Sequence, residues 1–244
     1  MLLKNEGLIK TVKFKQPKYV GDPINAVKIF NEKEVDELIF LDITATIENR
    51  RPPLGLISQI ASECFMPFCY GGGISSVEDI AELFKLGVEK VSINTQAVVN
   101  PLLIREAAEL FGSQSIVVSI DVKKNLFGKN RVFTHGGRKS TNRDPVDFAV
   151  QMEEAGAGEI FLNSIDRDGT MQGYDLELIK QIAASVGIPV IACGGAGRLD
   201  DFADAIKKAG ASAVSAGSFF VFQGSHRAVL ITYPPVNELE RRLN

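Results

Sequence analysis

The chain repeats a set of short motifs in its two halves, and this duplication restricts the folds that it can form. Each copy has a glycine run, a segment of helical pattern, a glycine and an apolar run, in the same order. The matched pairs are Gly71-Gly72-Gly73 with Gly194-Gly195-Ala196-Gly197, Asn94-Thr95 with Gly217-Ser218, and Ile39-Phe40-Leu41-Asp42 with Ile160-Phe161-Leu162-Asn163. Two halves of four β/α units close into one eightfold barrel, whereas a doubly wound sheet does not predict such a duplication.

Short apolar runs of β type alternate with longer segments of helical period. The runs are apolar on both faces, as expected for parallel strands that helices cover. We predict strands at 38–41, 66–70, 90–93, 115–120, 159–162, 189–192 and 213–215. Asp22-Pro23 and Asp144-Pro145 mark two helix starts, and Ser75-Ser76-Val77-Glu78 has the pattern of a capping box. The alternation predicts an α/β fold with a parallel sheet.

Length and composition fit a single domain of this kind. The chain has 244 residues, of which 45% are hydrophobic, and these supply a large core. A single (β/α)₈ TIM barrel has roughly 250 residues. Because no linker-like stretch divides the chain, we predict one barrel domain over residues 1–244. Its half-barrels are expected at about 1–118 and 119–244.

Charge, apolar pattern and cysteine usage exclude several classes of protein. A net charge of −3 with only isolated arginine pairs gives no basic field for nucleic acid. No apolar run has the roughly 18 residues that a membrane helix needs, and no signal-peptide pattern is present. The three cysteines have no metal-ligand spacing and suit a reducing compartment. We therefore expect a cytoplasmic protein with no nucleic-acid partner, no membrane partner and no metal.

Glycines at strand ends predict sites for anions. A glycine that directly precedes a helix lets backbone N–H groups approach an anion at the helix N-terminus. One such run is as often only a tight βα turn. Here the repeat supplies two copies, and each is paired with a hydroxyl-bearing residue, Thr95 or Ser218, at another strand end. Two copies on opposite sides of a barrel mouth favour a substrate with a phosphate group at each end.

Four aspartates lie at or just beyond predicted strand ends, where barrel enzymes keep their catalytic groups. They are Asp42, Asp121, Asp166 and Asp168. A carboxylate in such a partly dry site acts as a general acid or base if its pKa is raised. Asp121 directly follows a predicted strand and should point into the mouth, whereas we favour a loop role for Asp166. Lys10 and Lys123 are candidates to neutralise phosphate, although exposed lysines are usually only solvated.

These motifs resemble those of the cyclase subunit of imidazole glycerol phosphate synthase, the HisF family, over nearly the whole chain. The matching segments are 40–45, 71–74, 90–95, 134–139, 166–170 and 194–197. The family converts phosphoribulosyl-formimino-aminoimidazole-carboxamide ribonucleotide and ammonia to imidazole glycerol phosphate and aminoimidazole-carboxamide ribotide. Its ammonia comes from a glutaminase subunit on the amino-terminal face of the barrel and passes through the barrel. The resemblance thus implies a heterodimer with a glutaminase.

The resemblance also implies roles for individual residues. Asp121 matches one of two catalytic aspartates, and no cofactor is implied, because carboxylates and phosphate clamps suffice for the cyclisation. The implied ligands of one phosphate group are Gly73, Asn94 and Thr95, and those of the other are Asp168, Gly169, Gly195, Gly217 and Ser218. Three further residues, Lys10, Asp42 and Asn163, are expected to contact the substrate. Glu37, Lys90 and Glu159 match three members of a charged ring at the ammonia entrance.

The second catalytic aspartate of the family is missing. The repeat matches Ile120-Asp121-Val122-Lys123 with Met1-Leu2-Leu3-Lys4, so that Leu2 stands where the aspartate is expected. A shift by one residue gives Leu3, and neither side chain transfers a proton, so an acid–base pair has lost one member. Two further departures are Asn163 for a usual threonine and His135 for a usual tyrosine.

The first strand is expected to be truncated. A full strand precedes Asp121, but only Met1 precedes Leu2, which predicts unpaired strand edges. We expect the native protein to begin several residues upstream, where an arginine would complete the charged ring.

Three functions remain open. A paralogous branch of the family, associated with surface-polysaccharide genes, is similar in lacking the aspartate, and the segment 226–234 fits that branch. With a glutaminase and a third protein, the branch turns an acetamido sugar into an acetamidino sugar. We favour this branch over a working histidine-pathway cyclase, because a proton-transferring pair has lost a partner. A non-catalytic barrel that docks and activates a glutaminase is disfavoured, because such a scaffold has no use for two phosphate sites.

Overall fold

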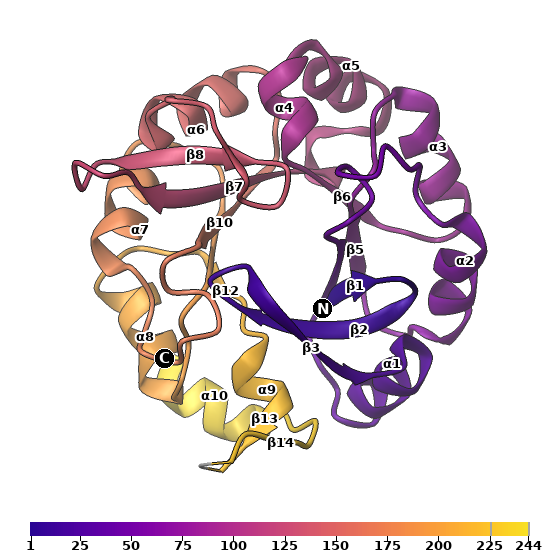
Figure 1. Cartoon of the computed structure of the whole chain (residues 1–244), viewed down its shortest axis with the longest axis vertical. Helices are drawn as coiled ribbons and strands as arrows, with labels where there is room; N and C mark the ends of the chain where they lie inside the picture. The colour runs from indigo at the N-terminus through magenta and orange to yellow at the C-terminus, as the bar shows by residue number, and fades with distance from the viewer. Residues whose placement is uncertain (225, 244) are drawn as a thin grey trace.

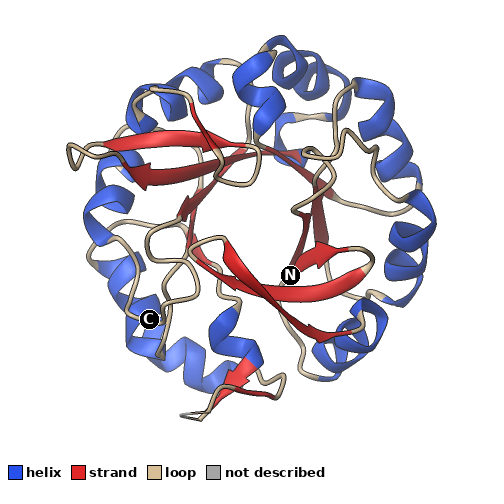
Figure 2. Cartoon of the chain, viewed as in Figure 1, coloured by secondary structure: helices blue, strands red, loops and turns tan. Residues whose placement is uncertain are grey.

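Eight parallel strands surrounded by helices form a barrel in the computed structural model, which describes residues 1–224 and 226–243 (Figures 1 and 2). The barrel strands are β1 (Leu2–Lys4), β4 (Leu38–Asp42), β5 (Phe68–Gly71), β6 (Lys90–Ile93), β7 (Ile116–Lys124), β10 (Glu159–Ser164), β11 (Val190–Cys193) and β12 (Ala213–Val214). They pair in parallel in this order from β1 to β12. The predicted (β/α)₈ barrel is thus confirmed, while the predicted division near residue 118 lies just inside β7.

The first strand is short. β1 pairs with β4 at only two positions, Leu2 with Leu41 and Leu3 with Asp42, and its other edge is occupied by β2 (Gly7–Val12). The backbone of Met1 extends the contact through hydrogen bonds with Ile39 and Leu41. Over the described residues no backbone ladder joins β12 to β1. In the described chain, a seam without backbone pairing therefore lies between β12 and β1.

The helices cover the outside of the strands and bury the main core. They are α1 (Pro23–Glu32), α2 (Leu54–Glu63), α3 (Val77–Lys85), α4 (Thr95–Val99), α5 (Leu102–Phe111), α6 (Pro145–Glu154), α7 (Leu176–Ala183), α8 (Leu199–Lys207), α9 (Ser218–Val221) and α10 (Val236–Leu243), with a 3₁₀ turn at Ser113–Ser115. Outward-facing strand residues such as Phe40 and Ile160 are fully buried beneath them. A smaller apolar cluster of Cys69, Val117, Phe161 and Ile191 fills the barrel itself. No helix in the described part of the chain is long and apolar enough to cross a membrane.

Helix caps follow the sequence signals closely. The side chains of Asp22 and Asp144 accept backbone hydrogen bonds at the starts of α1 and α6, where a proline occupies the first turn, as predicted. The capping box of α3 was predicted one residue too early. Its N-cap is Ser76, and the reciprocal partner is Asp79 rather than Glu78, because the aspartate stands three residues beyond the cap.

The internal repeat extends to the geometry of single residues. Asp79 accepts backbone hydrogen bonds from residues 75 and 76, and Asp201 accepts them in the same way from residues 197 and 198. Asn94 has φ −111° and ψ −74°, and Gly217 has φ −120° and ψ −64°. Both residues lie at a strand end that leads directly into a short helix. The two halves therefore present similar backbone at opposite sides of the mouth.

Hairpins that the sequence analysis did not predict extend from the carboxyl ends of the strands. They use β2, β3 (Lys15–Gly21), β8 (Asn130–Thr134) and β9 (Lys139–Ser140), with a separate small hairpin of β13 (Phe222–Gln223) and β14 (Ala228–Val229). In Figure 1, β2 and β3 cross in front of the barrel, and the hairpin of β7 and β8 extends beyond the ring of helices. The β2–β3 hairpin and the turn between β8 and β9 contribute to the rim of the site, for example at Phe14 and Gly136.

Candidate functional site

A cavity of about 350 Å³ lies at the carboxyl ends of the barrel strands. Most of the predicted phosphate and substrate residues line it, together with the predicted catalytic aspartate: Lys10, Asp42, Gly73, Asn94, Thr95, Asp121, Asn163, Asp168, Gly217 and Ser218. Leu2 lines the same cavity. Gly169 and Gly195 do not line it, and both lie against backbone: an added Cβ would overlap the carbonyl oxygen of Thr11 at Gly169 and that of Gly173 at Gly195. The structure thus gathers ten of the predicted residues around one space.

Asp121 is a buried carboxyl group inside β7, at the point where this strand begins to pair with β8. It is 9% exposed and lies beside Asn163, its register partner on β10. Burial raises the pKa of Asp121 to about 7, and the negative charge of Asp168 adds to the increase. A carboxyl group with this pKa is well suited to take up or release a proton near neutral pH. Asp121 is therefore a candidate for proton transfer in this cavity.

This raised pKa predicts a pH-dependent gain in stability for Asp121→Asn. The carboxyl pKa is about 7 in the folded chain and about 4 in an unfolded one, so folding takes up a proton between these pH values. The wild-type free energy of unfolding must therefore fall as pH rises from about 4 to 7. The asparagine variant should be more stable than wild type by up to about 4 kcal/mol at about pH 8, and equally stable at about pH 4.

Urea unfolding at the two pH values measures this difference. Glu106→Gln, at an exposed position on α5, is the matched control for loss of one carboxylate. A gain for Asp121→Asn that is as large at about pH 4 would show that ionisation of Asp121 is not its cause.

Lys10 joins the predicted second phosphate site. Its ammonium group is buried beside Gly217, where an added Cβ would overlap Nζ. Burial lowers the pKa of Lys10, and the nearby charge of Asp168 opposes this effect. Asp168 also accepts a hydrogen bond of 3.1 Å from Thr11 Oγ1. The cation, Gly217 and Ser218 thus converge on one side of the cavity, as a phosphate site requires.

Hydrogen bonds connect the predicted first phosphate site to the base of the β7–β8 hairpin. Asn94 Nδ2 donates to the carbonyl oxygens of Ser119 (3.0 Å) and Phe133 (3.3 Å). The backbone N–H of His135, a residue with φ +55°, donates to Thr95 Oγ1 at 3.2 Å. These bonds fix the strand end on which Asn94 and Thr95 lie. The hairpin was not predicted, so its contribution to the site could not be foreseen.

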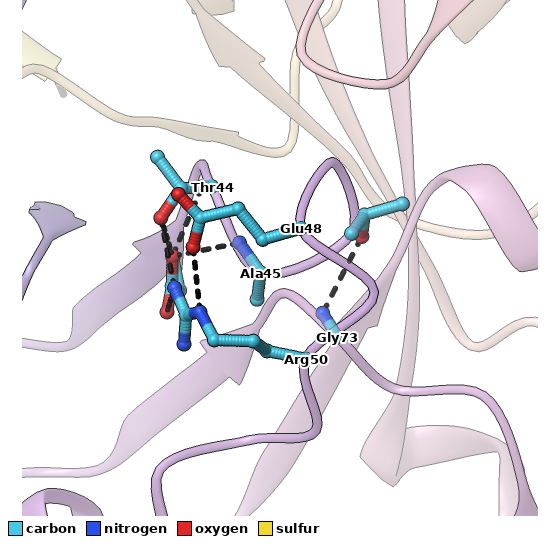
Figure 3. Close-up of polar contacts among 7 residues, drawn as sticks. Thr44, Ala45, Glu48, Arg50 and Gly73 are labelled. Carbon is cyan, nitrogen blue, oxygen red and sulfur yellow. Dashed lines mark hydrogen bonds and ion pairs between the residues drawn. The ribbon is translucent and has the colours of Figure 1, made fainter.

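Asp42 has a structural environment, although it also lines the cavity. Its Oδ1 atom accepts hydrogen bonds from the backbone of Thr44 and Ala45, both at 3.0 Å, and from the Thr44 hydroxyl at 3.1 Å. Arg50 Nη2 lies 3.3 Å from Oδ2, and Arg50 also bonds Glu48. Figure 3 shows Arg50 reaching back toward Thr44 and Ala45 across the loop. The protein therefore uses much of the hydrogen-bonding capacity of Asp42 to hold the loop between β4 and α2.

Removal of this carboxylate should destabilise the fold. Asp42→Ala would leave the N–H groups of Thr44 and Ala45 without their acceptor and Arg50 without an ion-pair partner. We expect the free energy of unfolding to fall by about 3 kcal/mol, as measured by urea unfolding. Glu106→Ala, at the exposed α5 position, should change it by less than about 0.5 kcal/mol. Equal effects of the two variants would contradict the structural role of Asp42.

The predicted ring members meet at the opposite end of the barrel. Lys90 Nζ lies 3.1 Å from Glu37 Oε2 and 2.8 Å from Glu159 Oε1. Burial lowers the pKa of Lys90, but its bonds to the two glutamates outweigh that effect and raise the pKa overall. Among the described residues Glu159 Oε2 is buried without a hydrogen-bond partner. A charged cluster therefore lies at the amino-terminal end of the strands.

Asn163 introduces an amide into the cavity beside Asp121. The residue is 6% exposed, and within the described chain its Oδ1 atom has no hydrogen-bond partner. Gly194 leaves the space for this amide, because an added Cβ there would contact Asn163 Oδ1. The side chain therefore retains hydrogen-bonding capacity next to the carboxyl group of Asp121.

The cysteines have the chemistry of buried thiols. Cys69 and Cys193 lie on barrel strands and are free, as is Cys64. Burial raises the pKa of Cys193 to about 12, so it is protonated at neutral pH and is a poor metal ligand. No group of three or more His, Cys, Asp or Glu side chains in residues 1–224 and 226–243 is placed to hold a metal ion.

Comparison with known proteins gives a consistent set of relatives. Residues 4–227 match the family model described as histidine biosynthesis protein. A Pseudomonas aeruginosa protein, provisionally named imidazole glycerol phosphate synthase subunit hisF2, is 58% identical over 98% of this chain and 96% of its own length. A Vibrio vulnificus protein, provisionally named subunit hisF3, is 51% identical over the whole chain and 94% of its own length. The imidazole glycerol phosphate synthase subunit HisF of Alkaliphilus metalliredigens is 46% identical over 87% of the chain and 84% of its own length.

Proposed function

Because the chain belongs to the histidine biosynthesis protein family, among its HisF subunits, we propose that it is a cyclase-like subunit that uses ammonia from a glutaminase partner. Its substrate carries two phosphate groups, bound at the two sides of the mouth. The support is the cavity, with Asn94 and Thr95 on one side and Lys10, Gly217 and Ser218 on the other. Asp121, which lies in the same cavity, is the proton-transferring group.

Leu2 is the observation that supports one of the alternatives over the others. It lines the same cavity as Asp121, at the position where the family's second aspartate is expected. An aliphatic side chain can neither donate nor accept a proton, so the acid–base pair of the histidine-pathway cyclisation is incomplete. We propose that this barrel has lost that cyclisation. It instead supplies glutamine-derived ammonia for conversion of an acetamido to an acetamidino group on a surface-polysaccharide sugar, in the cytoplasm.

The proposed partner is a glutaminase bound as a heterodimer at the amino-terminal end of the barrel. The relatives are named as subunits of a synthase, which supports a second subunit for this chain. Glu37, Lys90 and Glu159 form the charged cluster that ammonia would pass at this end. The cluster is separated from Asp121 by the apolar barrel filling of Cys69, Val117 and Phe161.

Turnover of the bisphosphate ribonucleotide with saturating ammonium tests the proposal. Ammonium replaces the partner's product, so the assay measures the chemistry of the barrel alone. We expect binding of the ribonucleotide without turnover. Turnover that is abolished by Asp121→Asn would instead identify a working histidine-pathway cyclase.

The scaffold alternative is tested by glutamine hydrolysis in the complex. If the barrel only docks and activates the glutaminase, Asp121→Asn leaves this activation unchanged and the barrel binds no bisphosphate ligand. Detectable binding of the ribonucleotide by the wild-type barrel would therefore count against a pure scaffold.

A further inference from the structure

The turn between β7 and β8 presents the two most exposed large apolar side chains of the described chain. Leu126 is 102% exposed and Phe127 is 86% exposed, and they are neighbours in sequence. The hairpin that carries them extends past the helices in Figure 1. Neither side chain contributes to the core or to the mouth cavity. An exposed apolar pair at such a point is a candidate contact surface.

The turn is built to hold these side chains outward. Asn125 Oδ1 accepts hydrogen bonds from the backbone N–H groups of Phe127 (2.9 Å) and Lys129 (3.0 Å). The backbone of Asn125 also bonds Gly128 and Lys129, and Gly128 has φ +76°. These bonds fix a tight loop in which Leu126 and Phe127 occupy the outermost positions. The pair is therefore displayed by an ordered turn.

The same hairpin is strongly basic, although the whole chain has a net charge of −3. Residues 123–131 contain Lys123, Lys124, Lys129 and Arg131 and no acidic residue. Lys123 stands directly opposite Arg131 in the ladder, and such like-charge pairs destabilise a hairpin. The nearby acids are Asp144, 3.7 Å from Arg131, and Asp166, whose carboxylate accepts from the backbone of Lys124. The exposed ammonium groups of Lys124 and Lys129 flank the apolar tip.

We propose that this hairpin tip docks the protein on an anionic lipid surface, with Leu126 and Phe127 inserted among the lipids and the surrounding cations on the headgroups. Apolar side chains surrounded by basic residues bind such surfaces, because the apolar groups are buried among the lipids and the basic groups are attracted to the anionic headgroups. A projecting two-residue tip needs no complementary pocket in a fluid lipid surface, whereas a protein partner would need one. Peripheral contact of this kind requires no membrane-spanning segment, so the proposal replaces the expectation of no membrane partner, which was drawn from the length of the apolar runs.

Co-sedimentation with lipid vesicles tests the proposal. We expect the full chain to sediment with vesicles of equal parts phosphatidylglycerol and phosphatidylcholine at about 0.1 M salt, and not with phosphatidylcholine alone. Binding should weaken strongly at about 0.5 M salt, because exposed charges are then screened. Lys124→Gln with Lys129→Gln should reduce the partition coefficient about 30-fold. Leu126→Ser with Phe127→Ser should reduce it at least about 10-fold.

Phe65→Ser is the matched control, since Phe65 is a comparably exposed aromatic (85%) in the loop between α2 and β5. It should leave the partition coefficient unchanged. The proposal is overturned if wild type fails to bind the anionic vesicles, or if Phe65→Ser weakens binding as much as the tip variants. It is also overturned if the tip variants leave vesicle binding intact and instead weaken a complex with another protein.

Discussion

Leu2→Asp is expected to give the barrel turnover of the bisphosphate ribonucleotide with ammonium, at least about a hundredfold above the wild-type chain. A positioned general acid or base contributes about 10²- to 10⁴-fold to a rate. Leu2 lines the cavity that contains Asp121, so a carboxylate at this position would supply the missing second proton-transferring group. The leucine is only partly buried, and the cavity side of β1 can therefore accept a polar side chain without loss of the core.

Leu2→Asn is the control for this prediction. Asparagine has the shape and polarity of aspartate but transfers no proton, so it should show no gain in turnover. Binding of the ribonucleotide, measured by calorimetry for both variants, separates lost affinity from lost chemistry. Equal turnover of the aspartate and asparagine variants would contradict the role assigned to position 2. Wild-type turnover that depends on Asp121 would contradict the loss of cyclisation itself.

Most of the predicted site residues that line the cavity share one physical property. They stand at the carboxyl ends of parallel strands, and the barrel brings all such ends to one mouth. The strand at 115–120 predicted the position of Asp121, and the repeat predicted Thr95 and Ser218 on opposite sides. The alternation of strands with helices and the internal repeat were enough to predict these positions, because closure of eight parallel strands into a barrel brings their carboxyl ends together.

The features that the sequence analysis missed depend on long-range contacts. Asp42 and Asp121 carry the same strand-end signal, but Asp42 is engaged by Arg50, which returns to it across a loop. The backbone of Thr11 lies over Gly169 only because the β2–β3 hairpin folds across the mouth. That hairpin has a largely polar, lysine-rich second strand, which gives no clear β pattern on its own. Local pattern cannot decide which of two similar aspartates remains free for chemistry.

Gly217→Ala is expected to reduce affinity for the bisphosphate ribonucleotide about a hundredfold with little change in stability. An added Cβ would overlap Lys10 Nζ, which is the flexible end of a side chain and can move without a backbone shift. The ammonium group would then leave the second phosphate site, where a charged hydrogen bond contributes about 1.5–3 kcal/mol. Calorimetry should record the loss of affinity. The free energy of unfolding, measured with urea, should change by less than about 1 kcal/mol.

Gly55→Ala is the matched control, because Gly55 lies in α2 with no atom near an added Cβ. It should leave affinity unchanged and stabilise the helix by up to about 1 kcal/mol. Lys10→Met should by itself weaken binding about as much as Gly217→Ala, and the double variant should show little further loss, because both changes remove the same ammonium group. Fully additive losses would mean that Lys10 and Gly217 act on the ligand separately. Unchanged affinity in Gly217→Ala would exclude this side of the cavity as a phosphate site.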